Sequence, residues 1–271
     1  MSDFLEKMAT LSAARAASVN RTFTSENLDR PVCALRLDRF DVIAEIKNRS
    51  PAEGELTGNA IARADRAQLY VDGGAAAISV LTEPDRFDGA LSHLEEVVAI
   101  AAVNDVPVLR KDFLVDTVQI LESRAAGASG VLLIASILDD RKLLSMLDCA
   151  FEHDLFVLLE SFEEGDLDRS VQVLRQPKYS EQAARQKLLV GVNTRNLRTL
   201  AVDPLRLRKY GPHLPAGVTC VAESGQYTAE DAASAAEWGY QMTLVGTALM
   251  RSPDPAKLIS DMLAAGRDKS P

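Results

Sequence analysis

The stretch "VPVLRKDFLVDTVQILESRAAGASGVLLI", residues 106–134, decides the fold. An apolar, β-branched run at 106–109 predicts a strand that ends at three consecutive charges. A helical segment follows, with Asp116 as its N-cap and Gly127 as its C-terminal stop. A second apolar run at 131–134 predicts another strand. A strand, a helix and a strand in this order are typical of a parallel β-α-β unit.

The same alternation continues along the chain from residue 42. Thr228 and Gly239, for example, bound another helical segment as cap and stop. The apolar runs are almost continuous, as expected of strands that are covered on both faces. We expect eight strands, at residues 42–46, 77–81, 106–109, 131–134, 156–159, 188–192, 218–222 and 242–245. This pattern predicts an α/β fold, a (β/α)8 TIM barrel, although strand count alone does not exclude an open doubly wound sheet.

The economical interpretation of residues 1–271 is a single domain, because the sequence contains no linker rich in Gly, Pro or Ser. Residues 42–265 form the expected barrel, and residues 1–41 form an N-terminal extension with a helix at 3–18. The polar segment "RQPKYSEQAARQK" at 175–187 precedes the sixth strand, and we expect it to be a surface loop.

Composition excludes several classes of protein. The net charge of -9 argues against a general nucleic-acid surface, so an anionic ligand needs locally clustered cations. Three widely spaced cysteines without a CxxC pair predict neither disulfides nor zinc and favour a reducing cytoplasm. No apolar run approaches the roughly 20 residues that span a bilayer, and early acidic residues argue against a secretion signal. We expect a cytoplasmic protein, monomeric or weakly dimeric, without nucleic-acid or membrane partners.

Polar residues gather where the expected strands end, which is where (β/α)8 barrels place their active sites. Glu45 and Lys47 are two residues apart and therefore point to the same side of an extended backbone. The full set at the ends of strands one, three, five, six and seven is Glu45, Lys47, Lys111, Glu160, Asn193, Arg195, Glu223 and Ser224. Lysines beside glutamates tune each other's pKa values and suit proton transfer without a metal or an organic cofactor.

The loops after strands seven and eight are the usual phosphate site of this fold. Gly225, Gly246 and Thr247 lie there, and Ser50 after strand one adds a hydroxyl. Phe87 and Phe113 stand on two further loops, where they either wall an aromatic pocket or simply pack. Plain alternatives exist for each feature: charged residues as a solvated rim, glycines as turns, and Arg110 with Asp112 as a structural pair. The residues alone favour an acid–base enzyme that binds a phosphorylated small molecule.

Six segments carry a resemblance to a known family. They are "IAEIKNRSPAEG", "ISVLTEPDRFDG", "VLRKDFLVDTVQILESRAAGA", "VGVNTRNL", "AESG" and "LVGTALMRSPDP". In order and spacing they resemble indole-3-glycerol-phosphate synthase of tryptophan biosynthesis, over residues 42–256. The resemblance implies a carbon–carbon lyase, a (β/α)8 barrel with an N-terminal helical extension, and no metal or organic cofactor. The implied reaction is ring closure, decarboxylation and dehydration of 1-(2-carboxyphenylamino)-1-deoxyribulose 5-phosphate to indole-3-glycerol phosphate.

The resemblance also implies roles for individual residues. Lys111 resembles the general acid that protonates the substrate carbonyl, Lys47 the lysine that binds the carboxylate and takes part in dehydration, and Glu160 the acid–base residue of the later steps. Glu45, Asn193 and Glu223 complete the implied catalytic set. Substrate contacts are implied for Arg195, Ser224, Phe87 and Phe113, and phosphate contacts for Ser50, Gly225, Gly246 and Thr247.

The sequence departs from the family pattern in two loops. In residues 48–56, Glu53 stands where the family commonly has a basic residue, and after strand five Ser161 and Phe162 replace Val and His. Two alternatives therefore stay open. One is isomerisation of phosphoribosylanthranilate, which would be expected to use a cysteine and an aspartate, and for which Cys220 lies inside the expected seventh strand. The other is a non-catalytic or substrate-shifted paralogue that binds a phosphorylated ligand.

Overall fold

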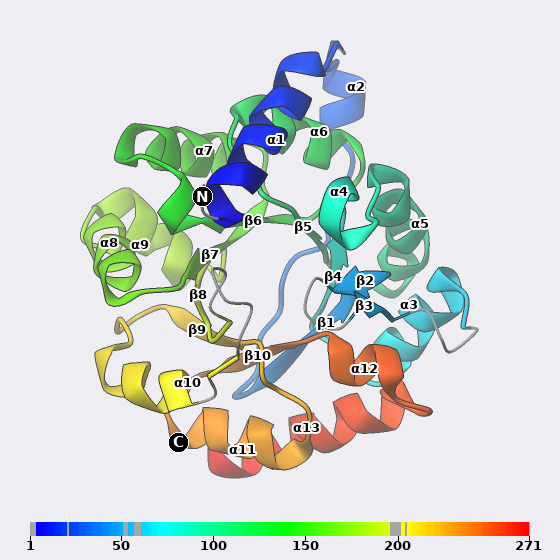
Figure 1. Ribbon diagram of the computed structural model, residues 1–271, viewed down its shortest axis with the longest axis vertical. Coiled ribbons are helices and arrows are strands. Elements are labelled where there is room, and N and C mark those ends of the chain that lie inside the picture. Colours follow the sequence, from blue (N-terminus) through cyan, green and yellow to red (C-terminus); the bar gives the residue numbers. More distant parts are fainter. Residues whose placement is uncertain are drawn as a thin grey trace.

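Parallel strand pairing closes the sheet into a barrel. The computed structural model describes residues 4–20, 22–50, 54–56, 61–195, 202–203 and 205–270, apart from the Ser50 side chain. Within these residues eight strands pair in the order β1-β10-β9-β8-β7-β6-β5-β4, and β4 pairs again with β1. They are β1 Asp41–Ile46, β4 Ala77–Leu81, β5 Val108–Lys111, β6 Gly130–Ile134, β7 Phe156–Ser161, β8 Leu188–Asn193, β9 Thr219–Glu223 and β10 Met242–Val245. The (β/α)8 prediction is confirmed, and the open-sheet alternative is wrong (Figure 1).

Helices connect successive strands and cover the outside of the barrel (Figure 1). They are α3 Arg63–Asp72, α4 Pro84–Phe87, α5 Leu91–Ala101, α6 Thr117–Ala125, α7 Asp140–Glu152, α8 Glu164–Leu174, α9 Pro177–Ala184, α10 Leu205–Tyr210, α11 Ala229–Glu237, α12 Thr247–Arg251 and α13 Pro255–Lys269. Asp116 and Thr228 cap α6 and α11 through side-chain bonds to backbone N–H groups, as predicted. A small hairpin, β2 Arg49–Ser50 with β3 Gly54–Glu55, follows β1. None of the helices in the described part of the chain is long and apolar enough to cross a membrane.

Two sequence-based expectations fail in detail. The strand predicted at 106–109 is β5, which begins two residues later and continues through Arg110 and Lys111. Pro107 has no N–H for the sheet, and the two charges stay in the strand because each has partners. The segment 175–187 is not a loop but contains helix α9, with Pro177 in its first turn. Tyr179 in α9 is buried and its hydroxyl donates to Asp148. One face of this helix therefore packs on the protein, although the segment is mostly polar.

Buried side chains form two layers that follow the alternation of the strands. Val42, Ala44 and Ile46 of β1 face the helices and belong to the outer layer. Ile43 of the same strand faces the barrel interior, where it joins Leu109, Leu132, Leu158, Leu189 and Val221. This alternation is the expected consequence of a period of two in extended chain. It also sends Glu45 inward, toward the mouth of the barrel.

The N-terminal extension lies on the barrel at the carboxyl ends of its strands. Its helix α1, Phe4–Ser18, lies in front of α6 with its N-terminal end near β6 (Figure 1), and α2, Ser25–Leu28, follows. Met8 of α1 is buried in the inner layer, and Ser12 accepts a hydrogen bond from Gln119 of α6 at 2.9 Å. The helix predicted at 3–18 is therefore present from Phe4, and Asp3 lies outside the described residues. This placement brings the extension to the edge of the barrel mouth.

Removal of a side chain from the inner layer should destabilise the barrel. Leu189 is fully buried, so Leu189→Ala should lower the free energy of unfolding by about 2–5 kcal/mol. Val103 is 85% exposed, and Val103→Ala should change it by less than about 0.5 kcal/mol. Urea unfolding followed by circular dichroism compares the two, and similar losses for both would contradict the inner-layer assignment.

Candidate active site

A pocket opens at the carboxyl ends of the barrel strands. Its empty volume, including its opening to solvent, is about 910 Å³. Leu81, Leu132, Ile134 and Leu244 form its apolar part. The predicted site residues that line it are Glu45, Lys47, Phe87, Lys111, Phe113, Glu160, Asn193, Arg195, Ser224, Gly225, Gly246 and Thr247. Side chains from strands far apart in the sequence thus converge on one cavity.

Lys111 lies at the centre of the charged part of the pocket. Its Nζ is 2.8 Å from Glu223 Oε2, 3.2 Å from Glu160 Oε2 and 4.0 Å from Glu45 Oε2. Burial lowers the pKa of Lys111, but the charges of Glu223, Glu160 and Glu45 raise it more, and the result lies above the ordinary lysine value. Lys111 is therefore an ammonium ion at neutral pH.

Glu223 has a higher pKa than an ordinary carboxyl group. It is fully buried, and burial together with the neighbouring Glu160 raises its pKa well above the usual range, although Lys111 opposes this. Its Oε1 is buried and has no hydrogen-bond partner within the described residues. Ionisation of a buried carboxyl beside a second carboxylate costs free energy, so Glu223 retains a proton more readily than a free glutamate would.

Glu45 and Lys47 form a second ion pair at the mouth of the barrel. Lys47 Nζ is 2.9 Å from Glu45 Oε1, as the two-residue spacing predicts. Burial raises the pKa of Glu45, but Lys47 and Lys111 together lower it below the ordinary value. Glu45 therefore stays ionised and links the two lysines, while Lys47 lines one side of the pocket.

Two glycines leave room for these carboxylates. A β-carbon on Gly191 of β8 would overlap Glu223 Oε1, and one on Gly246 would overlap Glu45 Oε1. Gly246 was expected to contact phosphate, but its packing against Glu45 and Lys47 is sufficient reason for a glycine there. Gly191 was not predicted at all, because the sequence does not show which side chain would face it across the barrel.

The remaining polar residues form the side of the pocket near β8, β9 and β10. Asn193 Oδ1 accepts a hydrogen bond from the Arg195 N–H at 2.9 Å, which fixes its amide. Ser224 and Gly225 both have left-handed backbone, with φ of 65° and 70°. Two such residues in succession make a sharp turn at the pocket, where glycine is well suited. Phosphate contacts at this turn stay a prediction, and the Ser50 side chain lies outside the described residues.

Three phenylalanines form the opposite side of the pocket, which we call the aromatic wall: Phe4, Phe87 and Phe113. The ring centroids of Phe87 and Phe113 are 6.2 Å apart, and those of Phe4 and Phe113 are 6.0 Å apart. Sequence reasoning missed Phe4, as well as Gln226 and Tyr227, which also line the pocket. The available signal for Phe4 was the four-residue spacing of Phe4, Met8 and Ser12, which places them on one helix face.

Cys220 does not reach this pocket. It is buried in β9 within the outer layer, between the strands and the helices. The reaction that would need a cysteine at a strand end therefore has no support from its position. Burial also raises the pKa of the Cys220 thiol to about 12, so the reactive thiolate is disfavoured.

A parallel eight-stranded barrel with lysines and glutamates converging on a pocket at its carboxyl ends defines a (β/α)8 acid–base enzyme of small molecules. Comparison with known proteins identifies a family within this class. Residues 6–262 match the family described as indole-3-glycerol phosphate synthase. An indole-3-glycerol phosphate synthase of Parafrankia sp. (strain EAN1pec) is 41% identical over 235 residues, 87% of this chain and 82% of that protein. The chain belongs to the indole-3-glycerol phosphate synthase family.

Other comparisons agree with this placement. An indole-3-glycerol phosphate synthase of Mycobacterium sp. (strain KMS) is 39% identical over 266 residues, 95% of this chain and 91% of that protein. Among solved structures, 3-hexulose-6-phosphate synthase from Salmonella typhimurium aligns with a TM-score of 0.62 and 16% identity, covering 85% of this chain and all of that one. At this identity the likeness to the solved structure shows the shared fold alone.

The lowered pKa of Glu45 gives a test of the charge network. A carboxylate whose pKa is lower in the folded state than the unfolded value of 4.5 stabilises the fold above that value. This contribution is lost as the pH falls through the folded pKa. In Glu45→Gln, the free energy of unfolding should therefore fall less steeply from about pH 5 to pH 3 than in the wild type.

Urea unfolding at a series of pH values measures the slope. Glu237→Gln is the matched control, because it removes a half-exposed carboxylate paired with Lys269 and should leave the slope unchanged. Equal slopes in the wild type and Glu45→Gln would show that Glu45 is not stabilised as an anion.

Proposed function

We propose that the protein closes the indole ring of 1-(2-carboxyphenylamino)-1-deoxyribulose 5-phosphate, releasing carbon dioxide and water to give indole-3-glycerol phosphate. Family membership supports the reaction. The observation that carries its assignment to this pocket is the position of Lys111 among Glu45, Glu160 and Glu223, between the aromatic wall and the Ser224–Gly225 turn. A substrate with an aromatic ring at one end and phosphate at the other matches that layout.

The main task of the pocket is to fold a flexible substrate. The ring carbon that bears the carboxylate must reach the ketone carbon, and a chain with several rotatable bonds seldom adopts that shape in solution. In our proposal the aromatic wall holds the ring, and Gly225, Gly246 and Thr247 hold the phosphate. Fixing both ends converts ring closure into a reaction of a near-attack conformer, an effect that lowers the barrier by about 7–11 kcal/mol in favourable cases.

Lys111 then serves the ring-closing step. As the ring carbon attacks, negative charge develops on the ketone oxygen, and an ammonium directed at that atom stabilises it. The raised pKa of Lys111 keeps the proton in place until the alkoxide, a far stronger base, takes it. Glu223, at 2.8 Å and inclined to hold a proton, is positioned to restore it.

Decarboxylation and dehydration complete the reaction. Loss of carbon dioxide leaves its electron pair in the ring and restores aromaticity. Dehydration then removes the hydroxyl with one added proton and takes one proton from the carbon beside nitrogen. We assign Lys47 to the substrate carboxylate and to the proton donation, and Glu160 to the proton removal. Lys47 is suited to this because Glu45 holds its Nζ at 2.9 Å in the pocket wall.

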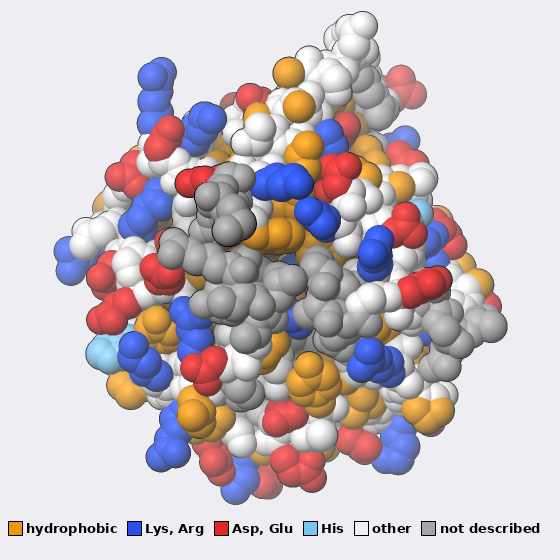
Figure 2. All heavy atoms as spheres, in the orientation of Figure 1, with side chains coloured by type: hydrophobic (Ala, Val, Ile, Leu, Met, Phe, Trp, Pro, Cys, Tyr) orange, Lys and Arg blue, Asp and Glu red, His pale blue; other side chains and the backbone are white. Residues whose placement is uncertain are grey.

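The alternative of a non-catalytic paralogue is not favoured, since the relatives named above are synthases and Lys47, Lys111, Glu160 and Asn193 are all present. We further propose that the protein acts in the cytoplasm without nucleic-acid or membrane partners. Three free cysteines suit a reducing compartment. Figure 2 shows acidic and basic side chains intermixed on the visible face, not gathered into a basic surface.

The proposed role of Lys111 predicts a large loss of turnover when its charge is removed. Wild-type protein mixed with the substrate should give rising indole fluorescence. Lys111→Met should lower kcat by about 10²–10⁴-fold, because a positioned proton donor typically contributes that much. The matched control is Lys178→Met, an exposed lysine paired with Asp148 on the outer helices, which should retain full activity. Full activity in Lys111→Met would remove Lys111 from the mechanism, and an inactive wild type would overturn the proposed function.

A further inference from the structure

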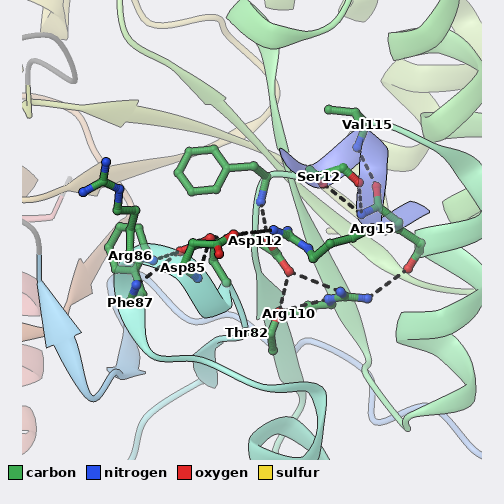
Figure 3. Close-up of polar contacts among 12 residues, drawn as sticks. Ser12, Arg15, Thr82, Asp85, Arg86, Phe87, Arg110, Asp112 and Val115 are labelled. Carbon is green, nitrogen blue, oxygen red and sulfur yellow. Dashed lines mark hydrogen bonds and ion pairs between the residues drawn. The ribbon is translucent and has the colours of Figure 1, made fainter. Parts of the chain in front are cut away.

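One guanidinium group touches all three segments that carry the aromatic wall. Arg15 lies in α1, eleven residues after Phe4 and on the face of the helix that packs on the barrel. Its Nη2 donates to Asp112 Oδ1 at 2.6 Å, and its Nη1 is 3.7 Å from Glu83 Oε1. Figure 3 shows the Arg15 side chain reaching from the helix to Asp112 and its neighbours.

Asp112 connects Arg15 to Phe113. The Asp112 side chain is almost fully buried, and its Oδ1 also accepts the Phe113 N–H at 2.8 Å. Its Oδ2 accepts from Thr82 Oγ1 at 2.9 Å and from Arg110 Nη2 at 3.2 Å (Figure 3). Every lone-pair direction of the carboxylate is thus occupied, so the backbone at Phe113 has little freedom to turn.

Glu83 connects Arg15 to Phe87. Glu83 is fully buried and is the N-cap of α4. Its carboxylate accepts the backbone N–H groups of Asp85 at 2.9 Å, Arg86 at 2.7 Å and Phe87 at 3.2 Å. Because the cap holds the whole of this four-residue helix, the position of the Glu83 carboxylate sets the position of the Phe87 ring.

Arg15 places a positive charge between two buried carboxylates. Glu83 and Asp112 are buried carboxylates on neighbouring loops, and burial together with the charge of Asp112 raises the pKa of Glu83. Arg15 lies between them, and its Nη1 is itself buried. Arg110 also pairs with Asp112, but Arg15 reaches both carboxylates. Without Arg15, repulsion between Glu83 and Asp112 would separate the two loops or leave Glu83 protonated. The two rings would then no longer meet at 6.2 Å.

We propose that Arg15 is a positioning residue that preassembles the aromatic wall, and that the N-terminal helix is in this way part of the substrate site. The inference rests on the proposed function, in which the wall holds the substrate's aromatic ring. Arg15 itself does not line the pocket and touches no reacting atom. Its removal should weaken binding of the ring end of the substrate and leave the phosphate end unaffected.

Two fragments that report on the two ends separate this role from a general structural one. The probes are anthranilate for the ring end and inorganic phosphate for the other, with dissociation constants measured by ligand-observed NMR. Arg15→Met should bind anthranilate about tenfold more weakly and bind phosphate within about twofold of the wild type, and its kcat/KM should fall by about ten- to a hundredfold. Arg15→Lys keeps the charge with a single-point contact and should recover part of the anthranilate affinity.

Arg36→Met is the matched control, because Arg36 is another arginine of the extension, paired with Asp105 on the surface. It should change neither constant. Equal weakening of both fragments in Arg15→Met would indicate general disruption and overturn the inference, as would unchanged anthranilate binding or a wild type that binds no anthranilate. If the wild type binds both fragments with the expected response to Arg15 but shows no turnover, the proposed function fails and the role of Arg15 stands.

Discussion

The interaction on which the site depends is the contact of one buried ammonium, on Lys111, with the carboxylates of Glu45, Glu160 and Glu223. A buried charge without partners would destabilise the fold by several kcal/mol, at roughly the scale of the total stability of a domain. Strands β1, β5, β7 and β9 must therefore bring these four side chains together as the barrel closes. The contacts that offset the cost of burying the Lys111 ammonium also raise its pKa. The interactions that stabilise the fold therefore also set the protonation state of the site.

The extension contributes to the site in a different way. A (β/α)8 barrel supplies strand ends that are rigid and loops that are less so, and the aromatic wall is built from loops. Helix α1 compensates by packing on α6 through Ser12, with Met8 buried in the inner layer and Phe4 in the pocket. Arg15 forms ion pairs with Glu83, the N-cap of α4, and with Asp112, the residue after Lys111. Rigid strands thus position the groups that move protons, and a docked helix positions the apolar surface that holds the ring.

Much of this could be predicted from the sequence because it is local. Apolar runs place the strands, Asp116 and Thr228 mark helix starts, and the two-residue spacing of Glu45 and Lys47 places them on one face. What failed depends on distant partners. Arg110 and Lys111 continue β5 because of Glu122 and Glu223, and Tyr179 turns a polar segment into a packed helix through Asp148. Gly191, Phe4 and Arg15 acquire their importance only when the barrel closes and α1 docks, which no short stretch of sequence records.

The charges of the pocket explain how an acidic protein can accept an anionic substrate. Three cations, Lys47, Lys111 and Arg195, line the pocket beside the carboxylates of Glu45, Asp112 and Glu160. The raised pKa of Glu223 means that this carboxyl group retains a proton more readily than a free glutamate, while Lys111 keeps its own. These cations face the pocket although the chain as a whole carries a charge of -9. Lys47 and Arg195 can therefore meet the anionic groups of the substrate, while Lys111 supplies the proton that ring closure consumes and Glu223, at 2.8 Å, can return it.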